Sequence, residues 1–382
     1  MADADAAIRE VVNNIAAQKH DKTEIKIHTT TSDGANYAYK LYEIVISAKN
    51  NSDLELFGKV AIIGEDVRSV VNVEIYEKEF FFYKHLVKEY KFLEEKYEIT
   101  DENKLRVPIC VGYNEEYLKE TIVMENLLKQ NFSNYDRLTS VNWDYASKCI
   151  KQLAILHSLS VVYGKENPKK FEEVANYLKF TYPKMFLEKA IGNAIAAAKD
   201  EYRERFSTFL EKIMENEAYE KFFKPFRLTV FAHGDFRPSN LMYRINENGI
   251  YEVAVVDFQT LQSGNPITDI LYFIYNGSDK EFRQRYYHQL LGYYYTELSA
   301  AFCRFGLQPN DIYSKSDFEY DLKEVLPYGL LIITTTLPIV TIDVANIPKV
   351  EDDLGYLDSK TSPLFAERLN DIISDYIELG VL

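Results

Sequence analysis

A short polar segment contains residues whose types and spacing suit phosphoryl transfer. Asp235 and Asn240 lie five positions apart in the segment HGDFRPSN, which begins at His233, and Asp257 ends the next apolar run. A carboxylate can accept the proton of an attacking hydroxyl, and carboxylate and amide oxygens are ligands that Mg²⁺ prefers. We therefore expect Asp235 to act as the general base, and Asn240 and Asp257 to bind Mg²⁺. His233 is better suited to bracing the loop than to transferring a proton.

The plainest alternative for this segment is a β-hairpin whose turn carries polar residues. An isolated HxDxxxxN pattern arises by chance in roughly one or two of every hundred chains of this length at ordinary residue frequencies. The run YEVAVVDF, which places Asp257 at the end of the next expected strand, favours the catalytic interpretation.

Residues upstream supply the parts that hold a nucleotide in a kinase-like site. Such a site needs a lysine on a strand, a glutamate on the next helix to pair with it, and a strand that joins two lobes. Lys59 lies in the apolar run FGKVA and Glu79 on the helical segment that follows. Considered alone, a lysine such as Lys59 usually lies on the surface, and a glutamate such as Glu79 is usually an exposed residue of a helix. Their order along the chain predicts that they hold the phosphates. The hinge residues that would contact adenine are Met124, Glu125 and Leu127, in the run IVMENL.

The spacing of apolar residues predicts a small β-rich lobe with one long helix over residues 1–128. Three short β-rich runs separated by turn residues fill residues 24–61, and a helical pattern covers 71–97. Two further strand-like runs follow at 107–113 and 120–127. Residues 1–22 can form one more helix, packed outside this lobe.

Residues 129–382 predict a larger, mainly helical lobe, so the expected fold class is α+β. Its long periodic segments lie at about 142–163, 171–191, 195–224, 279–305 and 364–379. Short strands interrupt the helices around the polar segment that carries Asp235 and Asn240. We expect this lobe to carry the catalytic and metal-binding loops and the substrate site.

The composition excludes several classes of protein. The chain has 382 residues, 47% of them hydrophobic and 27% charged, which suits two or three folded units. A net charge of −15 has the wrong sign for binding nucleic acid through its phosphates. Cys110, Cys149 and Cys303 are far apart and lack CxxC spacing, which argues against a disulfide framework or a zinc site.

The sequence predicts a cytoplasmic protein that does not enter a membrane. Its first residues are acidic where a signal peptide needs a basic region and an apolar core. The most apolar stretch, residues 328–348, is interrupted by three threonines, Pro338 and Asp343, so we expect a buried helical segment there.

Taken together, these stretches resemble the ecdysteroid kinase-like family, also called CHK kinase-like. This family is related to the aminoglycoside and choline phosphotransferases and has the two-lobed protein-kinase fold. The resemblance covers nearly the whole chain. The stretches that carry it are GANYA from Gly34, Lys59, EFFFY from Glu79, VPICVGY from Val107, VMENL from Val123, QLAILHS from Gln152, the His233 segment, DFQ from Asp257 and NPITDILYF from Asn265.

The resemblance implies an ATP- and Mg²⁺-dependent kinase that phosphorylates a hydroxyl group of a small molecule. It implies that Gly34 and Asn36 lie in the nucleotide loop and that Asp269 supports the catalytic loop from the next helix. A plain helix N-cap is the alternative for Asp269. The nucleotide loop has a single glycine, and Tyr39 stands where relatives commonly have a small serine. Fewer unhindered backbone N–H groups then face the phosphates, so binding would depend on Lys59 and Mg²⁺.

Other functions fit the sequence less well. A two-metal phosphoesterase needs clustered His and Asp ligands, and the six histidines form no such cluster. A nucleophilic hydrolase needs a GxSxG elbow, which does not occur. The main alternative is a catalytically inactive kinase-like module that binds a small apolar ligand or a protein partner. Lys59, Asp235, Asn240 and Asp257 are all present, which favours an active enzyme.

The identity of the substrate stays open at this stage. The resemblance suggests an alcohol such as an ecdysteroid or a related polyhydroxylated apolar compound, and an aromatic-rich helical lobe could enclose it. The acidic net charge suits a cationic substrate such as choline or an aminoglycoside instead. Neither consideration fixes the oligomeric state.

Overall fold

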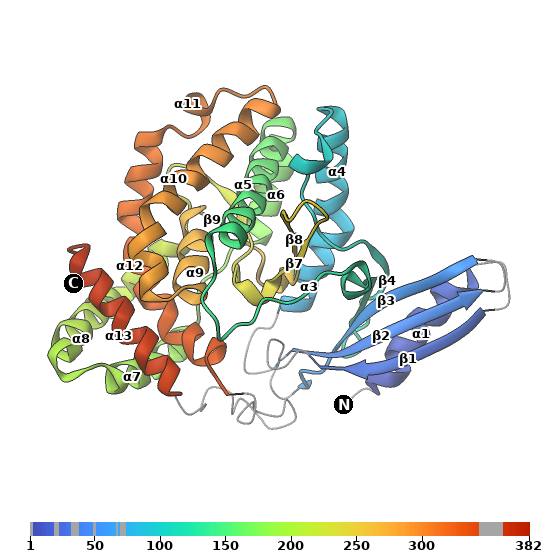
Figure 1. Cartoon of the computed structure of the whole chain (residues 1–382), viewed down its shortest axis with the longest axis horizontal. Helices are drawn as coiled ribbons and strands as arrows, with labels where there is room; N and C mark the ends of the chain where they lie inside the picture. The colour runs from blue at the N-terminus through green and yellow to red at the C-terminus, as the bar shows by residue number, and fades with distance from the viewer. Residues whose placement is uncertain are drawn as a thin grey trace.

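The computed structural model of the chain has a small lobe built on a sheet and a larger helical lobe (Figure 1). It describes residues 3–18, 23–31, 38–48, 51–65, 68, 74–343 and 362–382. The fold class is α+β, as the sequence predicts.

The small lobe contains a five-stranded antiparallel sheet with the strand order β1-β2-β3-β5-β4. The strands are β1 (Thr23–Thr30), β2 (Tyr39–Ala48), β3 (Asn51–Ala61), β4 (Cys110–Asn114) and β5 (Thr121–Glu125). Lys59 on β3 lies opposite Leu41 on β2 and Ile122 on β5, so it occupies the middle of the sheet. Because side chains alternate along a strand, each strand presents one set to each face of the sheet.

Helix α1 (Ala4–Ala17) covers the outer face of this sheet, as its apolar spacing predicts. Its Ile8, Val11, Val12 and Ile15 form a separate small core with residues of β2, β3 and β5. The helix lies so close to the sheet that a Cβ at Gly58 would come within 2.6 Å of the Ile8 side chain. A glycine on β3 therefore makes room for α1.

The other face of the sheet meets a long helical segment that carries Glu79. The segment consists of α3 (Ile75–Phe81), a π-helical turn η1 (Phe82–Leu86) and α4 (Val87–Lys96). It falls within the predicted helix at 71–97, whose first residues lie outside the described part of the chain.

The larger lobe is built around α5 (Trp143–Glu166), α9 (Ile267–Gly277), α10 (Lys280–Arg304) and α12 (Lys315–Val340). Two small sheets pair β6 (Val230–Ala232) with β9 (Gln262–Gly264), and β7 (Leu241–Ile245) with β8 (Tyr251–Val255). The other helices are α6 (Pro168–Tyr177), α7 (Lys184–Ala197), α8 (Asp200–Met214), α11 (Pro309–Ile312) and α13 (Pro363–Glu378), with short 3₁₀ turns at η2 (Asp101–Asn103), η3 (Leu127–Gln130), η4 (Glu215–Phe223), η5 (Pro238–Asn240) and η6 (Phe258–Thr260).

The predicted lengths of two long helices are wrong. The segment 171–191 divides into α6 and α7, because Pro183 cannot continue a helix and stands at the N-cap of α7. The segment 195–224 divides into the end of α7, α8 and η4. Asn216 and Glu217 have φ angles of +50° and +58°, which end the regular helix there.

Helix α12 is long and apolar enough to cross a membrane by length and composition alone. Most of its apolar window is nevertheless buried inside the protein, which agrees with the predicted buried helix. The part of the predicted segment after residue 343 lies outside the described residues. Cys110, Cys149 and Cys303 are all free, in agreement with the sequence analysis.

Candidate active site

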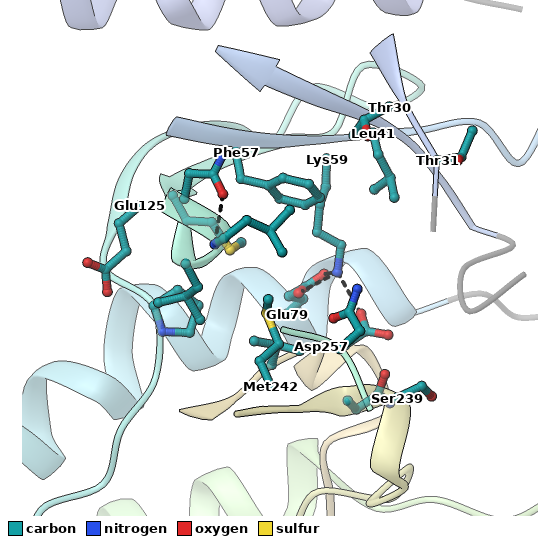
Figure 2. Close-up of a pocket in the computed structure, with 18 residues that line it drawn as sticks. Thr30, Thr31, Leu41, Phe57, Lys59, Glu79, Glu125, Ser239, Met242 and Asp257 are labelled. Atoms are coloured by element: carbon teal, nitrogen blue, oxygen red, sulfur yellow. Dashed lines mark hydrogen bonds and ion pairs between the residues drawn. The ribbon is translucent and has the colours of Figure 1, made fainter. Parts of the chain in front are cut away.

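A pocket lies between the sheet of the small lobe and the β7–β8 hairpin of the larger lobe (Figure 2). It contains seven of the residues predicted from the sequence: Lys59, Glu79, Met124, Glu125, Leu127, Asn240 and Asp257. Its other lining residues are Thr30, Thr31, Leu41, Phe57, Pro108, Asn126, Leu128, Asn134, Ser239, Met242 and Val256. The pocket thus has one apolar part near the hinge and one polar part near Lys59.

The ammonium group of Lys59 is the centre of the polar part. Its Nζ donates to Glu79 Oε1 at 2.8 Å and Oε2 at 3.0 Å, and to Asp257 Oδ1 at 2.6 Å. Figure 2 shows the Lys59 side chain descending from the sheet to both carboxylates. Burial by itself would lower the pKa of Lys59, but the charges of Asp257 and Glu79 outweigh it and raise that pKa. Lys59 therefore stays a cation inside the site.

Asp257 is held in an unusual backbone conformation, with φ of +69°. The next residue, Phe258, is buried and stacks on Phe82 with ring centroids 3.4 Å apart. This stacking joins the Asp257 turn to the helical segment that carries Glu79. Burial alone would raise the pKa of Asp257, but the charge of Lys59 and its hydrogen bond lower it overall.

The loop that begins at His233 is held by backbone hydrogen bonds to Asp269 on α9. Asp269 Oδ2 accepts from the His233 N–H at 2.7 Å, and Oδ1 accepts from the Gly234 N–H at 2.9 Å. His157 on α5 donates from Nε2 to Asp269 Oδ2 at 3.1 Å. Burial alone would raise the pKa of Asp269, but hydrogen bonding and charge from His157 lower it overall. Asp269 is therefore an ionised acceptor that fixes the start of the loop.

His233 braces the loop from within. Its Nε2 donates to the Val256 carbonyl at 3.0 Å, and its Nδ1 accepts from the Asp235 N–H at 3.3 Å. The imidazole thereby connects the Asp235 loop to the residue before Asp257, with both ring nitrogens in use.

The carboxylate of Asp235 is fixed by side chains on both of its oxygens. Tyr272 on α9 donates its hydroxyl to Oδ1 at 2.5 Å, and Asn240 donates from Nδ2 to Oδ2 at 2.9 Å. Arg237 Nε lies 3.2 Å from Oδ2 and forms an ion pair with it. Asp269 and Tyr272 are three residues apart on α9 and so lie on the same face of the helix. One helix therefore supports the loop through its backbone and through the side chain of Asp235.

The hinge strand β5 ends at Glu125, next to the pocket. The Glu125 N–H donates to the Ile109 carbonyl, and the Asn126 N–H donates to the Glu55 carbonyl. The Ile109 N–H donates to the side chain of Glu125 at 3.1 Å and not to its carbonyl. The Leu127 N–H, at the start of η3, has no partner among the described residues. Both residues line the pocket.

The residues proposed to bind a metal provide oxygen ligands of the right kind. No group of three or more His, Cys, Asp or Glu side chains suited to a metal occurs among the described residues. Asn240 uses its amide nitrogen to bind Asp235, and Asp257 uses one oxygen to bind Lys59, so Asn240 Oδ1 and Asp257 Oδ2 have no hydrogen-bond partner among the described residues. A carboxylate and an amide oxygen that face one pocket suit Mg²⁺, which keeps water and substrate phosphates as its remaining ligands.

Three predicted residues stand apart from the pocket walls, and two cannot be placed. Asp235 is 7% exposed and reaches the pocket only through Asn240, whereas His233 and Asp269 are buried behind it. Gly34 and Asn36 lie outside the described residues.

Sequence reasoning did not single out Tyr272 or His157, which hold Asp235 and Asp269 respectively. Both lie in stretches that carry the family resemblance, at Gln152–Ser158 and Asn265–Phe273. The spacing of Tyr272 from Asp269 could have pointed to a shared helix face.

The sequence matches the family described as Ecdysteroid kinase-like over residues 33–306. The chain belongs to the ecdysteroid kinase-like family. The matched range includes Lys59, Glu79, the His233 loop and Asp257, which the fold brings into one site. With this geometry, family membership makes the protein a small-molecule kinase, a phosphotransferase that acts on hydroxyl groups, on a two-lobed kinase-like fold.

The structure was also compared with solved structures, and three of the similar chains are kinases or phosphotransferases by name. A Plasmodium vivax ethanolamine kinase is 10% identical, with a TM-score of 0.48 over 94% of this chain and 83% of that one. The GDP complex of an aminoglycoside 2'-phosphotransferase is also 10% identical, with a TM-score of 0.46 over 95% and 97%. A microcompartment-associated aminopropanol kinase is 8% identical, with a TM-score of 0.45 over 97% and 98%. The sequence matches none of the curated proteins with which it was compared.

Proposed function

We propose that this protein transfers the γ-phosphate of ATP to an alcohol hydroxyl of a small apolar molecule. The observation that carries the proposal is the Lys59 ammonium, held between Glu79 and Asp257 at the polar end of the pocket. A buried lysine fixed in this way can neutralise phosphate charge, and positioning with charge neutralisation supplies most of the rate in phosphoryl transfer.

The hinge favours adenine over guanine as the base. The Glu125 carbonyl would accept a hydrogen bond from the amino group of adenine, and the Leu127 N–H would donate to a ring nitrogen. Guanine presents a carbonyl oxygen where adenine has its amino group, so it would oppose the Glu125 carbonyl with a second acceptor. Leu41, Phe57 and Met242 supply apolar surface for the flat base.

Asn240 and Asp257 would hold Mg²⁺, which supplies charge neutralisation at the phosphates when bound. Asp257 would bind the metal through Oδ2, the oxygen that Lys59 does not contact. Lys59, paired with Glu79, would neutralise charge on the phosphates.

Asp235 would orient the acceptor hydroxyl and accept its proton. Tyr272, Asn240 and Arg237 keep the carboxylate in one orientation, so it need not reorganise during the reaction. The name of the family suggests an ecdysteroid or a related polyhydroxylated apolar alcohol as the acceptor. In this proposal residues 1–128 bind the nucleotide, and residues 129–382 contribute Asp235, the metal ligands and the acceptor site.

Nucleotide binding tests the first half of the proposal. We expect Mg·ATP to raise the Tm of the parent protein, because a ligand at a hundred times its Kd adds about 2.7 kcal/mol when it binds only the folded state. Mg·GTP should raise the Tm less. Asp257→Ala should remove most of the Mg²⁺-dependent part of the rise. No rise with millimolar Mg·ATP would contradict the proposal, and an equal rise in Asp257→Ala would contradict the metal role.

Transfer of labelled phosphate tests the second half. We expect the parent to label a polyhydroxylated steroid in preference to choline or an aminoglycoside. Asp235→Asn should bind Mg·ATP like the parent but lose turnover by about 10²- to 10⁴-fold, the usual contribution of a general base. Retained turnover in the purified variant would exclude Asp235 as that base.

A further inference from the structure

Strand β2 carries two tyrosines that each donate a hydroxyl to a carboxylate, on opposite faces of the sheet. Tyr39 donates to Glu79 Oε2 at 2.5 Å, toward the pocket. Tyr42 donates to Asp5 Oδ1 at 2.5 Å, toward α1 on the outer face. The same strand therefore contains one tyrosine in contact with the phosphate-binding pair and a similar one that is remote from it.

Tyr39 makes two kinds of contact with the Lys59–Glu79 pair. Its hydroxyl binds Glu79 Oε2, which also accepts from Lys59 at 3.0 Å. Its ring lies beside the Lys59 ammonium, with Nζ 4.2 Å from the ring centroid. A cation close to the face of an aromatic ring is attracted by the ring quadrupole. The ring is itself fixed by an edge contact with Tyr76 at 5.0 Å between centroids.

The hydrogen bond from Tyr39 to Glu79 matters because the Glu79 side chain is fully buried. A carboxylate taken out of water needs several donors to remain ionised, and Lys59 alone supplies them from one side only. Burial and the charge of Asp257 raise the pKa of Glu79 overall, and the Lys59 charge and the hydrogen bonds from Lys59 and Tyr39 limit that rise. Tyr39 therefore supplies a second donor and restricts the rotation of the carboxylate.

We propose that Tyr39 is a positioning residue for phosphate binding, which acts by fixing Glu79 and, through it, Lys59. The inference rests on the proposed nucleotide site and assigns one more residue to it. Without the hydroxyl, Glu79 would keep its contact with Lys59 but lose its fixed plane. Lys59 would then meet the phosphates in more than one position and bind them less tightly.

The test compares a ligand that has phosphates with one that has none. Isothermal titration calorimetry on the full chain would measure the Kd of Mg·ADP and of adenosine for the parent and for Tyr39→Phe. We expect the Kd of Mg·ADP to rise about tenfold, the scale of one hydrogen bond to a charged group. The Kd of adenosine should change by less than about twofold. Because Phe keeps the ring, the contacts with Tyr76 and Lys59 remain.

Tyr42→Phe is the matched control, because it removes an equivalent hydroxyl from the same strand on the far side of the sheet. It should leave both dissociation constants unchanged. A second control combines Tyr39→Phe with Lys59→Met. If Tyr39 acts through Lys59, its removal should cost nothing further in the Lys59→Met background.

The outcomes separate the inference from the function on which it rests. A parent protein that does not bind Mg·ADP would overturn the proposed function and the inference with it. A parent that binds, with Tyr39→Phe equal to it, would overturn the role of Tyr39 alone. If Tyr39→Phe weakened the binding of Mg·ADP and adenosine equally, the substitution would have disrupted the whole pocket, and the role of Tyr39 would be overturned. A further loss of Mg·ADP affinity in the Lys59→Met background would overturn it as well.

Discussion

The two sides of the pocket hold their functional residues by different means. On the side of the small lobe, Lys59, Glu79 and Tyr39 are held by one another's side chains. On the side of the larger lobe, the His233 loop is held mainly through backbone groups, with Asp269 accepting from two N–H groups and His233 binding a carbonyl. Side-chain networks can adjust when one member changes, whereas a backbone loop has few alternative conformations.

This difference predicts where the molecule tolerates change. The small lobe should respond to mutation mainly through the strength of nucleotide binding. The His233 loop of the larger lobe should respond through turnover, because the geometry of Asp235 depends on the path of that loop.

Among the residues that support the site without touching a substrate, the largest effect is expected at Gly234. Its φ is +81°, and a Cβ there would lie 2.2 Å from the Thr260 carbonyl oxygen, which is backbone and cannot turn aside. Gly234→Ala should lower the Tm by about 3–8 °C and turnover by about 10²-fold. Gly58→Ala is the control in the small lobe, because there the new Cβ meets only the flexible side-chain ends of Ile8 and Ile44. Equal losses of turnover in the two variants would contradict the comparison.

A smaller effect is expected at Tyr272, which fixes Asp235 as Tyr39 fixes Glu79. Tyr272→Phe should lower kcat by about tenfold, on the scale of one hydrogen bond to a charged group, and leave the Kd of Mg·ADP unchanged. Tyr39→Phe should instead raise the Kd of Mg·ADP more than it lowers kcat. Steady-state kinetics with ATP hydrolysis as the assay, alongside calorimetry, would measure both. A weakened nucleotide affinity in Tyr272→Phe would show that the two sides are not independent.

The smallest effect is expected at Glu94 on α4, a buried acid that lacks the lysine partner of Glu79. Its Oε1 accepts from the Leu105 N–H at 2.7 Å, and burial raises its pKa to about 7. The folded state therefore retains a proton that the unfolded state releases near pH 4.5, so unfolding free energy falls as the pH rises from about 4.5 to 7.

Glu94→Gln removes this titration and can keep the hydrogen bond to Leu105. We expect its Tm to exceed that of the parent by a few degrees at pH 8 and to equal it near pH 4.5. Thermal unfolding at the two pH values checks this. A difference of the same size at both would mean that the charge of Glu94 is not its cause.

The residues that would bind phosphate and Mg²⁺ were the easiest to predict from the sequence. Lys59, Glu79, Asn240 and Asp257 follow from the residue types that phosphate and Mg²⁺ require, in the order that a two-lobed site imposes. The structure brings these four into one pocket. The roles assigned to them remain proposals that the binding and transfer experiments test.

The residues that hold the catalytic loop in place were harder to predict. Tyr272 and His157 lie among many apolar residues at helical spacing, and such aromatic residues are more often core than site. Their function depends on α5 and α9 packing behind one loop, which is a tertiary contact. The breaks within the predicted helices at 171–191 and 195–224 were missed for a related reason, since apolar periodicity continued across Pro183 and Asn216.

The position of α1 bears on how the protein should be produced. The family match starts at residue 33, whereas α1 and β1 lie before it and complete the small lobe. A fragment cut at that boundary would uncover Tyr42, Ile44, Leu56 and Val123, which α1 now keeps from water. An apolar sheet face exposed in this way favours aggregation. We therefore expect a fragment that starts at residue 33 to be less soluble than the chain that includes α1, so expression plasmids should encode α1 as well.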